Sequence, residues 1–455
     1  MIRKVLLLAF LFSYISGSAQ NSLDGTIHGL GKSKVYLLGV YGERTRLCDS
    51  TFSDSLGKIH FNLALNTIPG LYRVGWGKTG LVNLILNREN VKFETRAGFP
   101  EDSLKIISSK ENEIFHTFTG MAKMNQSKLE LLMPVVDFYP VRDVLYNKVA
   151  AEFEAIQKVQ HAFLDSMVQK HPDSYAVRME EVLQTPYIPA SLSTNVRMEY
   201  LKQHYWDHVN FNDTALLRSN VFADKIISYL AIYQNNQLKQ KQLEAEFIKA
   251  VTVALGAASV CPETYKFMLD YLVGGFDKYH FDDVITYIAD NFQDPFSCED
   301  AARKSALQKK LDNFKKLSVG KIAPSIEVPD MKGVKVNLLS IKSEFTLLVF
   351  WSSQCPHCTD MMPKLKTWYD KQKPKKLEVL AVSLDTNKND WVSFVKKEKL
   401  NWINVSELKG YLGKAEDEFN VYATPTMYLL DHEKKIIAKP ITWRELEQVL
   451  SQNIN

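Results

Sequence analysis

The chain has 455 residues, of which 45% are hydrophobic and 24% charged, and this length suits roughly two to four domains of ordinary size. Its formal net charge is only +4, and the sequence has no arginine-rich tract or basic stripe, so no nucleic acid partner is expected. Five cysteines are far too few for a scaffold that depends on disulfides.

The first residues have the layout of a secretory signal peptide. Arg3 and Lys4 precede an apolar run over residues 5–15, and small residues follow and end at Ala19. The apolar run is shorter than the roughly 18 to 20 residues that a membrane helix needs, and no later stretch of the sequence reaches that length. We therefore expect residues 1–19 to be a signal peptide and the mature protein to be exported to the periplasm or cell envelope.

Residues 20–105 are rich in short segments in which apolar and polar residues alternate, such as "GTIHGL", "SKVYLLGVYG", "KIHFNLAL" and "LVNLILN". Glycine, asparagine, aspartate and proline separate these segments, and such residues interrupt strands. Gly57 and the pair Pro69 and Gly70 mark two of the turns. The pattern predicts an antiparallel β-sandwich, with Cys48 in the strand "TRLCDST" as a buried apolar filler.

From residue 106 to residue 316 the sequence changes to long runs with helical spacing, as in "VLYNKVAAEFEAIQKVQHAFLDSMVQKH" and "LRSNVFADKIISYLAIYQNN". Prolines interrupt these runs, and the helices are expected to break at Pro134, Pro140, Pro172, Pro186, Pro189, Pro262 and Pro295. Residues 106–316 are therefore predicted to form an α-helical region.

One segment of this region has histidines at the spacing of a metal site. In "HYWDH", His204 and His208 would share one face of a helix, with Asp207 beside them. The zinc-protease pattern also needs a glutamate after the first histidine, and Tyr205 stands there. We interpret the segment as a partly buried aromatic helix and expect no metal.

Two further cysteines, Cys261 and Cys298, lie in the same region. In an oxidising compartment they could pair with each other, but a sequence does not establish the geometry that a disulfide requires. Otherwise they are small core residues. Both alternatives stay open.

Residues 317–455 alternate between strand and helix patterns. "FTLLVFW" is a nearly unbroken apolar run, as expected of a strand that is buried on both faces. After it come the helical pattern "PHCTDMMPKLKTWYDKQK", the strand "LEVLAVSLD", and later the strand "KKIIAK" and the helix "WRELEQVLSQ". This order predicts an α/β domain with a central sheet covered on both faces.

The stretch "WSSQCPHCTD" places two cysteines between the buried strand and the next helix. This spacing suits half of a zinc site, a structural crosslink or a reversible dithiol. A zinc site needs a second ligand pair, and the sequence has no other Cys-x-x-Cys motif or nearby Cys/His pair. The reversible dithiol is therefore favoured.

The strand-loop-helix order gives the two sulfurs different roles. Cys355 would lie at the start of the helix, with Pro356 in the first turn, where a missing N–H costs nothing. The free amide groups, the helix dipole and a protonated His357 would all stabilise a thiolate on Cys355 and make it the nucleophile. Cys358, one helical turn further, would resolve the mixed disulfide. We expect Trp351, Pro356 and His357 to tune the redox properties.

The segments "GKIAPSIEVPD", "FWSSQCPHC", "VLAVSLD" and "YATPTMYLLD" occur in this order. With them, residues 317–455 resemble the thioredoxin-like family, specifically the exported thiol-disulfide oxidoreductases of the ResA and TlpA type. The resemblance implies a cis Pro425 that faces the dithiol, and a Thr424 whose backbone pairs with an extended substrate. It also implies no cofactor beyond the redox-active disulfide itself.

Two departures from the family concern proton transfer. Plain thioredoxins carry a buried acid where this chain has Val349, and the ResA-like members carry a glutamate where it has Met361. The proton acceptor for Cys358 is therefore not identified. The Pro-His pair between the cysteines resembles that of strongly oxidising bacterial dithiol oxidases, so the redox direction is open as well.

The leading functional hypothesis is a dithiol oxidoreductase that reduces disulfides in exported proteins or in apocytochrome c and is recharged by a membrane electron donor. A peroxiredoxin-like peroxidase is an alternative, for which Ser352 fits the expected motif, whereas Leu348 stands where that motif has proline. The third is a binding protein with a redox-sensing dithiol, and a homodimer is compatible with each of them. The regions before residue 317 resemble uncharacterised regions that precede thioredoxin modules in some exported bacterial proteins, which implies an architecture but no activity.

Overall fold

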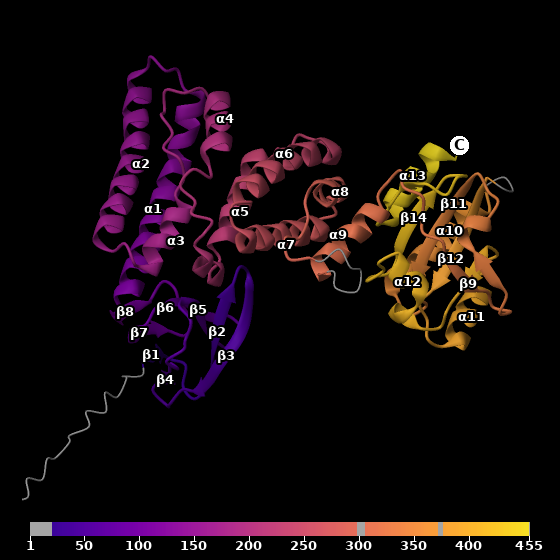
Figure 1. Ribbon diagram of the computed structural model, residues 1–455, viewed down its shortest axis with the longest axis horizontal. Helices are drawn as coiled ribbons and strands as arrows, with labels where there is room; N and C mark the ends of the chain where they lie inside the picture. The colour runs from indigo at the N-terminus through magenta and orange to yellow at the C-terminus, as the bar shows by residue number, and fades with distance from the viewer. Residues whose placement is uncertain (1–20, 298–304, 372–375, 455) are drawn as a thin grey trace, which may run out of the picture. The chain divides into compact units, whose positions relative to one another are not determined.

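The computed structural model describes residues 21–297, 305–371 and 376–454 (Figure 1). The predicted signal peptide, residues 1–19, and Cys298 with its proposed pairing lie outside the described residues. One compact unit comprises the described residues up to Gln237 together with Lys249–Tyr271, and the other comprises Leu238–Ile248 and the described residues from Leu272 onward.

The N-terminal region consists of two four-stranded sheets. The first has the strand order β4-β1-β7-β8, with β4 (Lys58–Asn62), β1 (Ser22–His28), β7 (Val91–Arg96) and β8 (Lys105–Ser108). The second has the order β3-β2-β5-β6, with β3 (Arg44–Phe52), β2 (Lys34–Tyr41), β5 (Gly70–Trp76) and β6 (Gly80–Leu86). Alternate side chains of both sheets, among them those of Leu23, Phe93 and Trp76, meet in one apolar core. The predicted sandwich is confirmed.

The pairing of these strands departs from the prediction at one place. Strand β1 is antiparallel to β4 but parallel to β7. The prediction of a purely antiparallel sandwich rested on short local segments, and strand direction depends on long connections that these segments do not specify. The remaining described pairs of the sandwich are antiparallel.

Cys48 is exposed rather than buried, so the prediction of an apolar filler is wrong. It lies on β3, an edge strand whose residues are exposed with the exception of one that is half-buried. Leu37 pairs with Asp49 and Leu38 with Leu47, so Cys48 is the extra residue of a β-bulge. The alternation of the sequence indicated a strand, but a strand at the edge of a sheet is not required to bury either face.

The middle region is helical, as predicted. Its helices are α1 (Lys110–Phe138), α2 (Val144–Lys170), α3 (Tyr175–Leu183), α4 (Thr194–His204), α5 (Val221–Tyr233), α6 (Gln240–Ala258), α7 (Pro262–Lys278), α8 (Asp282–Asn291) and α9 (Ala306–Lys316), and the 3-10 turn η1 (Thr214–Arg218) precedes α5. The long helices α1 and α2 lie side by side (Figure 1).

The predicted break at Pro134 is wrong, because α1 continues through this proline to Phe138. Proline removes one backbone hydrogen bond of a helix, and close to the end of a helix few further bonds depend on it. Val136, two residues later, is buried in a cluster with Phe153 and Ala190. This packing holds the last turn of α1 in place.

The segment "HYWDH" does not form one helix face. Helix α4 ends at His204, whose Nδ1 lies 2.7 Å from Oδ2 of Asp207, and His208 is exposed beyond the helix. Tyr205 and Trp206 between them are buried. Among the described residues, no three side chains of the metal-binding types are grouped closely enough to hold an ion.

The C-terminal region has the predicted α/β fold. Its five-stranded sheet has the order β13-β12-β11-β14-β15, formed by β13 (Ile403–Val405), β12 (Leu377–Ser383), β11 (Phe345–Trp351), β14 (Thr426–Leu430) and β15 (Ile436–Ala438). Strands β11, β12 and β13 are parallel, and β14 and β15 are antiparallel to their neighbours. Helices α10 (Pro356–Tyr369), α11 (Lys388–Lys397), α12 (Lys414–Glu418) and α13 (Trp443–Asn453) surround the sheet, and a hairpin of β9 (Glu327–Pro329) and β10 (Lys335–Asn337) precedes it.

The central strand β11 is buried on both faces, as its unbroken apolar sequence predicted. Leu347, Val349 and Trp351 contribute to the core that includes residues of α10, α11 and α13. Leu348 and Phe350 point into the core on the other face. Strand β11 therefore fixes the start of the loop that leads to the two cysteines.

In the part of the chain that the structure describes, no helix combines the length and the apolar character that crossing a membrane requires.

Candidate active site

Cys355 is the N-cap residue of α10, and Pro356 occupies the first turn of that helix. The backbone N–H of Cys358 donates to Sγ of Cys355 over 3.3 Å. A sulfur in this position accepts from the free amides at the helix start and faces the positive end of the helix dipole. The strand-loop-helix order of the sequence thus places Cys355 where a thiolate is stabilised.

Two opposing effects act on the pKa of Cys355. Partial burial would raise the pKa of this thiol, but hydrogen bonds from Cys358 and from the side chain of Thr424 lower it, and so does the backbone N–H of His357. The net result is a pKa below the ordinary value. Cys355 is also partly exposed to solvent, so its thiolate is both stabilised and accessible.

Cys358 lies one turn further along α10 and is fully buried. Burial raises the pKa of its thiol to about 12, and the neighbouring sulfur of Cys355 contributes to this rise. The two sulfurs of the motif are therefore chemically unequal. One is a partly exposed, acidic thiol, and the other is a buried thiol that keeps its proton at neutral pH.

Thr424 and Pro425 lie opposite the dithiol. The peptide bond between them is cis. Sγ of Cys355 lies 3.3 Å from the backbone oxygen of Thr424, to which its S–H can donate. The structure thus brings four of the predicted site residues together, although Thr424 is 69 positions from Cys355 in the sequence.

The three residues that were expected to tune the site lie in different surroundings. Trp351 is completely buried, and its ring packs 5.2 Å from that of Phe394 between centroids. Pro356 and His357 are exposed at the start of α10. Trp351 can therefore influence the site only through its packing below the loop, whereas the side chain of His357 is exposed to solvent.

Sequence reasoning did not single out Asp385, which follows β12 and is buried. Its Oδ1 accepts from Oγ of Ser352 at 2.8 Å and from Oγ of Ser353 at 2.9 Å, and both of its carboxylate oxygens lie 3.1 Å from the backbone nitrogen of Ser353. Its Oδ2 accepts from Oγ of Ser383 at 2.8 Å. Asp385 thus fixes the two residues that connect β11 to Gln354 and Cys355.

A signal for Asp385 was present in the sequence. The residue follows a buried parallel strand, and the carboxyl ends of neighbouring parallel strands meet at one edge of a sheet. Trp351, the last residue of β11, pairs with Ser383, the last residue of β12. A carboxylate two residues after Ser383 therefore had to lie beside the loop that follows Trp351.

The two family positions that would supply a proton acceptor are buried and apolar. Val349 is fully buried on β11, and Met361 is buried on α10. Asp360 is exposed and pairs with Lys364, their charged atoms 2.7 Å apart. Among these three residues, none offers a buried carboxylate to Cys358.

The other two described cysteines are not among the residues of this site. Cys261 is buried, and its Sγ lies 3.5 Å from Oε2 of Glu263. Cys48 is exposed on β3. The question of a pair between Cys261 and Cys298 stays a prediction, because Cys298 is outside the described residues.

Comparison with family models gives two matches. Residues 319–439 match the AhpC/TSA family, and residues 150–283 match a domain of unknown function (DUF5106). The first match covers the strands and helices that carry the dithiol and the Thr424–Pro425 bond. The second falls in the helical region and brings no activity with it.

Curated relatives match a part of the chain of similar length. The thiol-disulfide oxidoreductase ResA of a Bacillus cereus strain is 32% identical over 134 residues, which are 30% of this chain and 76% of that protein. The sporulation thiol-disulfide oxidoreductase A of Bacillus subtilis (strain 168) is 32% identical over 127 residues, 26% of this chain and 74% of that protein. Among solved structures, the thioredoxin domain of a thiol-disulfide oxidoreductase from Bacteroides vulgatus is 29% identical and covers 30% of this chain and 99% of its own, with a TM-score of 0.29.

Proposed function

This chain belongs to the family of thiol-disulfide oxidoreductases that includes ResA, and we propose that it exchanges a Cys355–Cys358 dithiol with disulfides of exported proteins, in the direction of reduction. The observation that carries the proposal is the inequality of the two sulfurs. Cys355 is partly exposed, with a lowered pKa, at the start of α10, and Cys358 is buried with a pKa of about 12. A nucleophile and a resolving thiol need these two environments.

The proposed reaction has two steps. The thiolate of Cys355 attacks one sulfur of a substrate disulfide, a mixed disulfide forms, and the other substrate sulfur leaves as a thiolate that takes up a proton. Cys358 then attacks Sγ of Cys355, its proton passes to the second departing substrate sulfur, and the Cys355–Cys358 disulfide forms. The substrate gains two electrons and two protons. The protein loses two electrons and the proton of Cys358, and the other proton comes from solvent, to which Cys355 released its own when the thiolate formed.

The state of Cys358 favours reduction of the substrate. A dithiol is a strong oxidant when its reduced form is strongly stabilised as a thiolate. Here the pKa of Cys355 is lowered although burial opposes this, whereas Cys358 stays protonated because burial raises its pKa to about 12. The reduced form is therefore stabilised only in part, and the pair is suited to give electrons away.

The setting we propose follows from the start of the sequence. Residues 1–19 have a signal-peptide layout, so the protein would work in the periplasm or cell envelope, where disulfides form and persist. Continued reduction there needs a source of electrons, which we propose to be a membrane electron donor. Apocytochrome c is one substrate with the required pair of cysteines, and cytochrome c maturation is the corresponding pathway.

Two measurements on the full chain test the proposal. The first is equilibration with glutathione mixtures, and the expected potential is closer to the roughly −270 mV of a reducing thioredoxin than to the roughly −120 mV of a strongly oxidising dithiol. The second is reduction of insulin disulfides, which Cys355→Ser should abolish and Cys48→Ser, a change at an exposed cysteine elsewhere, should leave intact. A potential near the oxidising value would reverse the proposed direction, and full activity of Cys355→Ser would remove the proposed site.

A peroxidase is the second candidate, because the matching family model is the AhpC/TSA family. Ser352 fits the motif of such a site, and its Oγ donates to Asp385 at 2.8 Å. Leu348, at the motif's proline position, is fully buried on β11. Consumption of hydrogen peroxide by the reduced chain at a rate above that of free cysteine would favour this candidate.

A further inference from the structure

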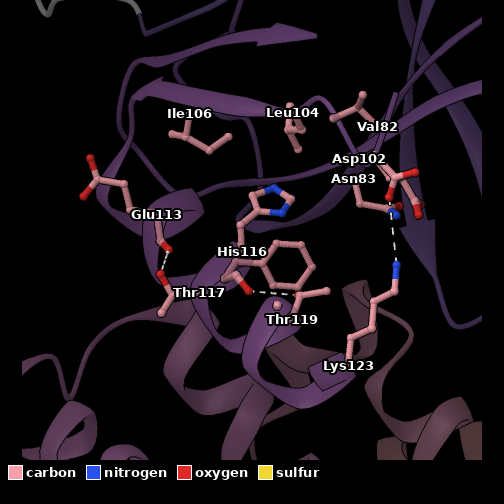
Figure 2. A pocket seen from close by; sticks show the side chains of 13 residues that line it. Val82, Asn83, Asp102, Leu104, Ile106, Glu113, His116, Thr117, Thr119 and Lys123 are labelled. Carbon is pink, nitrogen blue, oxygen red and sulfur yellow. Dashed lines mark hydrogen bonds and ion pairs between the residues drawn. The ribbon is translucent and has the colours of Figure 1, made fainter. Parts of the chain in front are cut away.

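The N-terminal unit contains a cavity of about 570 Å³ between α1 and the strands β6 and β8 (Figure 2). These are edge strands of the two sheets, so the cavity lies where the sandwich is open. Its apolar lining includes Val82 on β6, Leu104 and Ile106 at β8, and Phe115 on α1. The volume lies within the range of pockets that bind small molecules.

The hydroxyl groups of the cavity offer acceptors rather than donors. Oγ1 of Thr117 donates to the backbone oxygen of Glu113 over 2.7 Å, and Oγ1 of Thr119 donates to the backbone oxygen of Phe115 over 2.9 Å. Each hydroxyl proton is thus directed at a carbonyl of α1, and only oxygen lone pairs remain for a ligand.

His116 adds a further acceptor. Burial lowers the pKa of its imidazole, while a hydrogen bond with the backbone of Asn83 raises it in part. The lowered pKa favours the neutral ring, in which one nitrogen carries a proton and the other accepts. Within the described residues, the buried Nε2 has no hydrogen-bond partner, and the ring lies edge-on to Phe115, 5.0 Å between centroids. A buried polar atom of this kind calls for an explanation.

The polar lining also includes the carboxylates of Glu101, Asp102 and Glu113, the amide of Asn83 and the ammonium group of Lys123. Asp102 faces Lys123 at 3.9 Å, and Glu113 faces Lys110 at 3.6 Å. The side chains of both pairs are mostly exposed, and ion pairs of this length in water are weak. A cation held inside the cavity can therefore compete with these lysines for the carboxylates.

We propose that this cavity binds an organic cation, an ammonium or guanidinium group on an apolar body. The apolar body would lie against Val82, Leu104 and Ile106, and the cationic group would meet the carboxylates of Glu101 and Asp102. This ligand chemistry matches a lining in which acceptors outnumber donors. A free amine and the side chain of a lysine or arginine in a peptide both have this chemistry.

The test compares two ligands that share one apolar body and differ in charge. Calorimetric titration of the full chain with phenethylammonium should give saturable binding at one site. Titration with 3-phenylpropionate should show binding at least about tenfold weaker, the ratio expected of one unfavourable charge contact that is partly solvated. Equal binding of the two ligands, or no binding of phenethylammonium, would overturn the proposal.

A change at Gly120 tests whether the cavity is the site. Gly120 lines it from α1, and a Cβ at this glycine would meet no atom within 4 Å. Gly120→Leu should therefore preserve the helix, fill the cavity and reduce the affinity for phenethylammonium by at least about tenfold. Gly256→Leu is the matched control, because Gly256 is also an exposed helical glycine with open space around its Cβ. Unchanged binding in Gly120→Leu would place the site elsewhere.

A second pair of variants tests the charges, and a peptide tests the source of the cation. Glu101→Gln combined with Asp102→Asn should weaken phenethylammonium binding and leave 3-phenylpropionate no weaker than before, whereas Glu130→Gln, an exposed change elsewhere on α1, should alter neither. Binding of acetyl-Phe-Lys-Phe-amide through the same site would indicate a peptide ligand. Binding of phenethylammonium without the peptide would indicate a free amine.

Discussion

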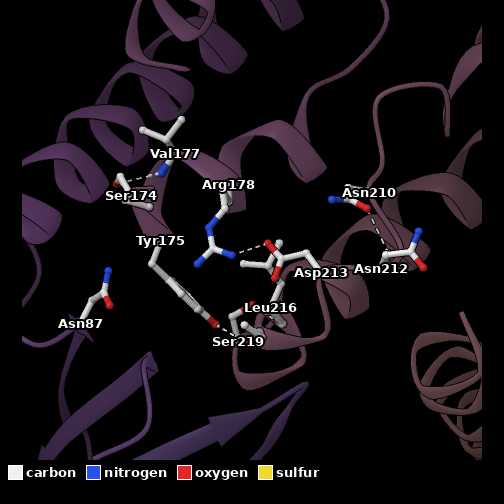
Figure 3. A network of polar contacts seen from close by, with 12 residues as sticks. Asn87, Ser174, Tyr175, Val177, Arg178, Asn210, Asn212, Asp213, Leu216 and Ser219 are labelled. Atoms are coloured by element: carbon white, nitrogen blue, oxygen red, sulfur yellow. Dashed lines mark hydrogen bonds and ion pairs between the residues drawn. The ribbon is translucent and has the colours of Figure 1, made fainter. Parts of the chain in front are cut away.

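The N-termini of helices α3 and α10 both present free backbone N–H groups, and different side-chain groups accept hydrogen bonds from them. At α3 the carboxylate of Glu111 accepts from Oγ of Ser174 at 2.8 Å and from the backbone nitrogens of Tyr175 and Ala176 at 3.0 Å each. Figure 3 shows Ser174 and Tyr175 at this helix start, with Asn87 nearby, whose side chain donates to Glu111 over 2.7 Å. At α10 the group is the sulfur of Cys355, which accepts from the backbone nitrogen of Cys358.

The two sites differ in how much of the anion is left free. Glu111 is buried and receives four hydrogen bonds, so its charge serves to join α1, α3 and the sandwich. Cys355 is partly exposed, and its sulfur has room for a reaction partner. A helix N-terminus stabilises an anion in both places. Whether that anion is structural or reactive depends on its exposure and on the nucleophilicity of its atom.

The largest effect is expected at the sulfurs. Because the pKa of Cys355 is lowered and burial raises that of Cys358 to about 12, alkylation of the reduced chain at pH 7 should be faster at Cys355 by about a thousandfold or more. The rate should rise with pH and level off below the value of about 8.5 that a free thiol shows, since the thiolate is the reacting form. Stopped-flow alkylation between pH 4 and 9 measures this profile.

Single serine variants assign that profile to a residue. The fast phase should vanish in Cys355→Ser and persist in Cys358→Ser, which should also accumulate a mixed disulfide with the substrate. Equal alkylation rates for the two thiols would remove the distinction between a reactive and a buried sulfur.

The second-largest effect is expected on the free energy of unfolding, when the carboxylate at the start of α3 is removed. Glu111→Gln keeps the size of the side chain but turns an amide NH₂ toward groups that donate hydrogen bonds, so buried donors lose their acceptor. We expect the free energy of unfolding to fall by about 2 kcal/mol, in line with the cost of leaving buried donors unsatisfied. Urea unfolding measures this, and Glu130→Gln on the same helix is the control. A loss no larger than that of the control would mean that the capping carboxylate is dispensable.

The same comparison shows what the sequence could and could not predict. The thiolate position of Cys355 followed from local order, because a buried strand, a short loop and a Pro-containing helix start are all adjacent in the sequence. The role of Glu111 did not, since its partners Ser174, Tyr175 and Ala176 are more than 60 residues away. Local patterns specify elements and caps that are close in sequence, whereas long-range caps depend on packing.

Two further cases follow the same division. The burial of "FTLLVFW" was predictable because an unbroken apolar run needs cover on both sides. The exposure of Cys48 was not, since alternation predicts a strand without telling whether it lies at an edge of the sheet. Asp385 was predictable only in part. Its position after a parallel strand was visible, but its contacts with Ser352 and Ser353 required the pairing of β11 with β12.

Asp385 provides the third prediction, which concerns positioning of the reactive anion. Asp385→Asn replaces one acceptor oxygen by a donor and should loosen the loop at Ser352 and Ser353, at a cost of about 1 kcal/mol in the free energy of unfolding. If the loop holds Cys355 at the helix start, the alkylation profile should move to higher pH and Asp385→Glu should restore it only in part. A purely structural role would lower stability and leave the alkylation profile unchanged.

The smallest effect is expected at His357, whose side chain is exposed two residues after Cys355. Its backbone N–H is among the groups that lower the pKa of Cys355, and that donor is kept in His357→Ala. Only the charge of the ring is lost, and an exposed charge contact is weak. A cation near the thiolate stabilises the reduced form, so its loss should make the potential more negative by about 10 to 20 mV. Glutathione equilibria of the variant and the parent would measure this difference. An unchanged or more positive potential would mean that the helix dipole, rather than the charge of His357, dominates.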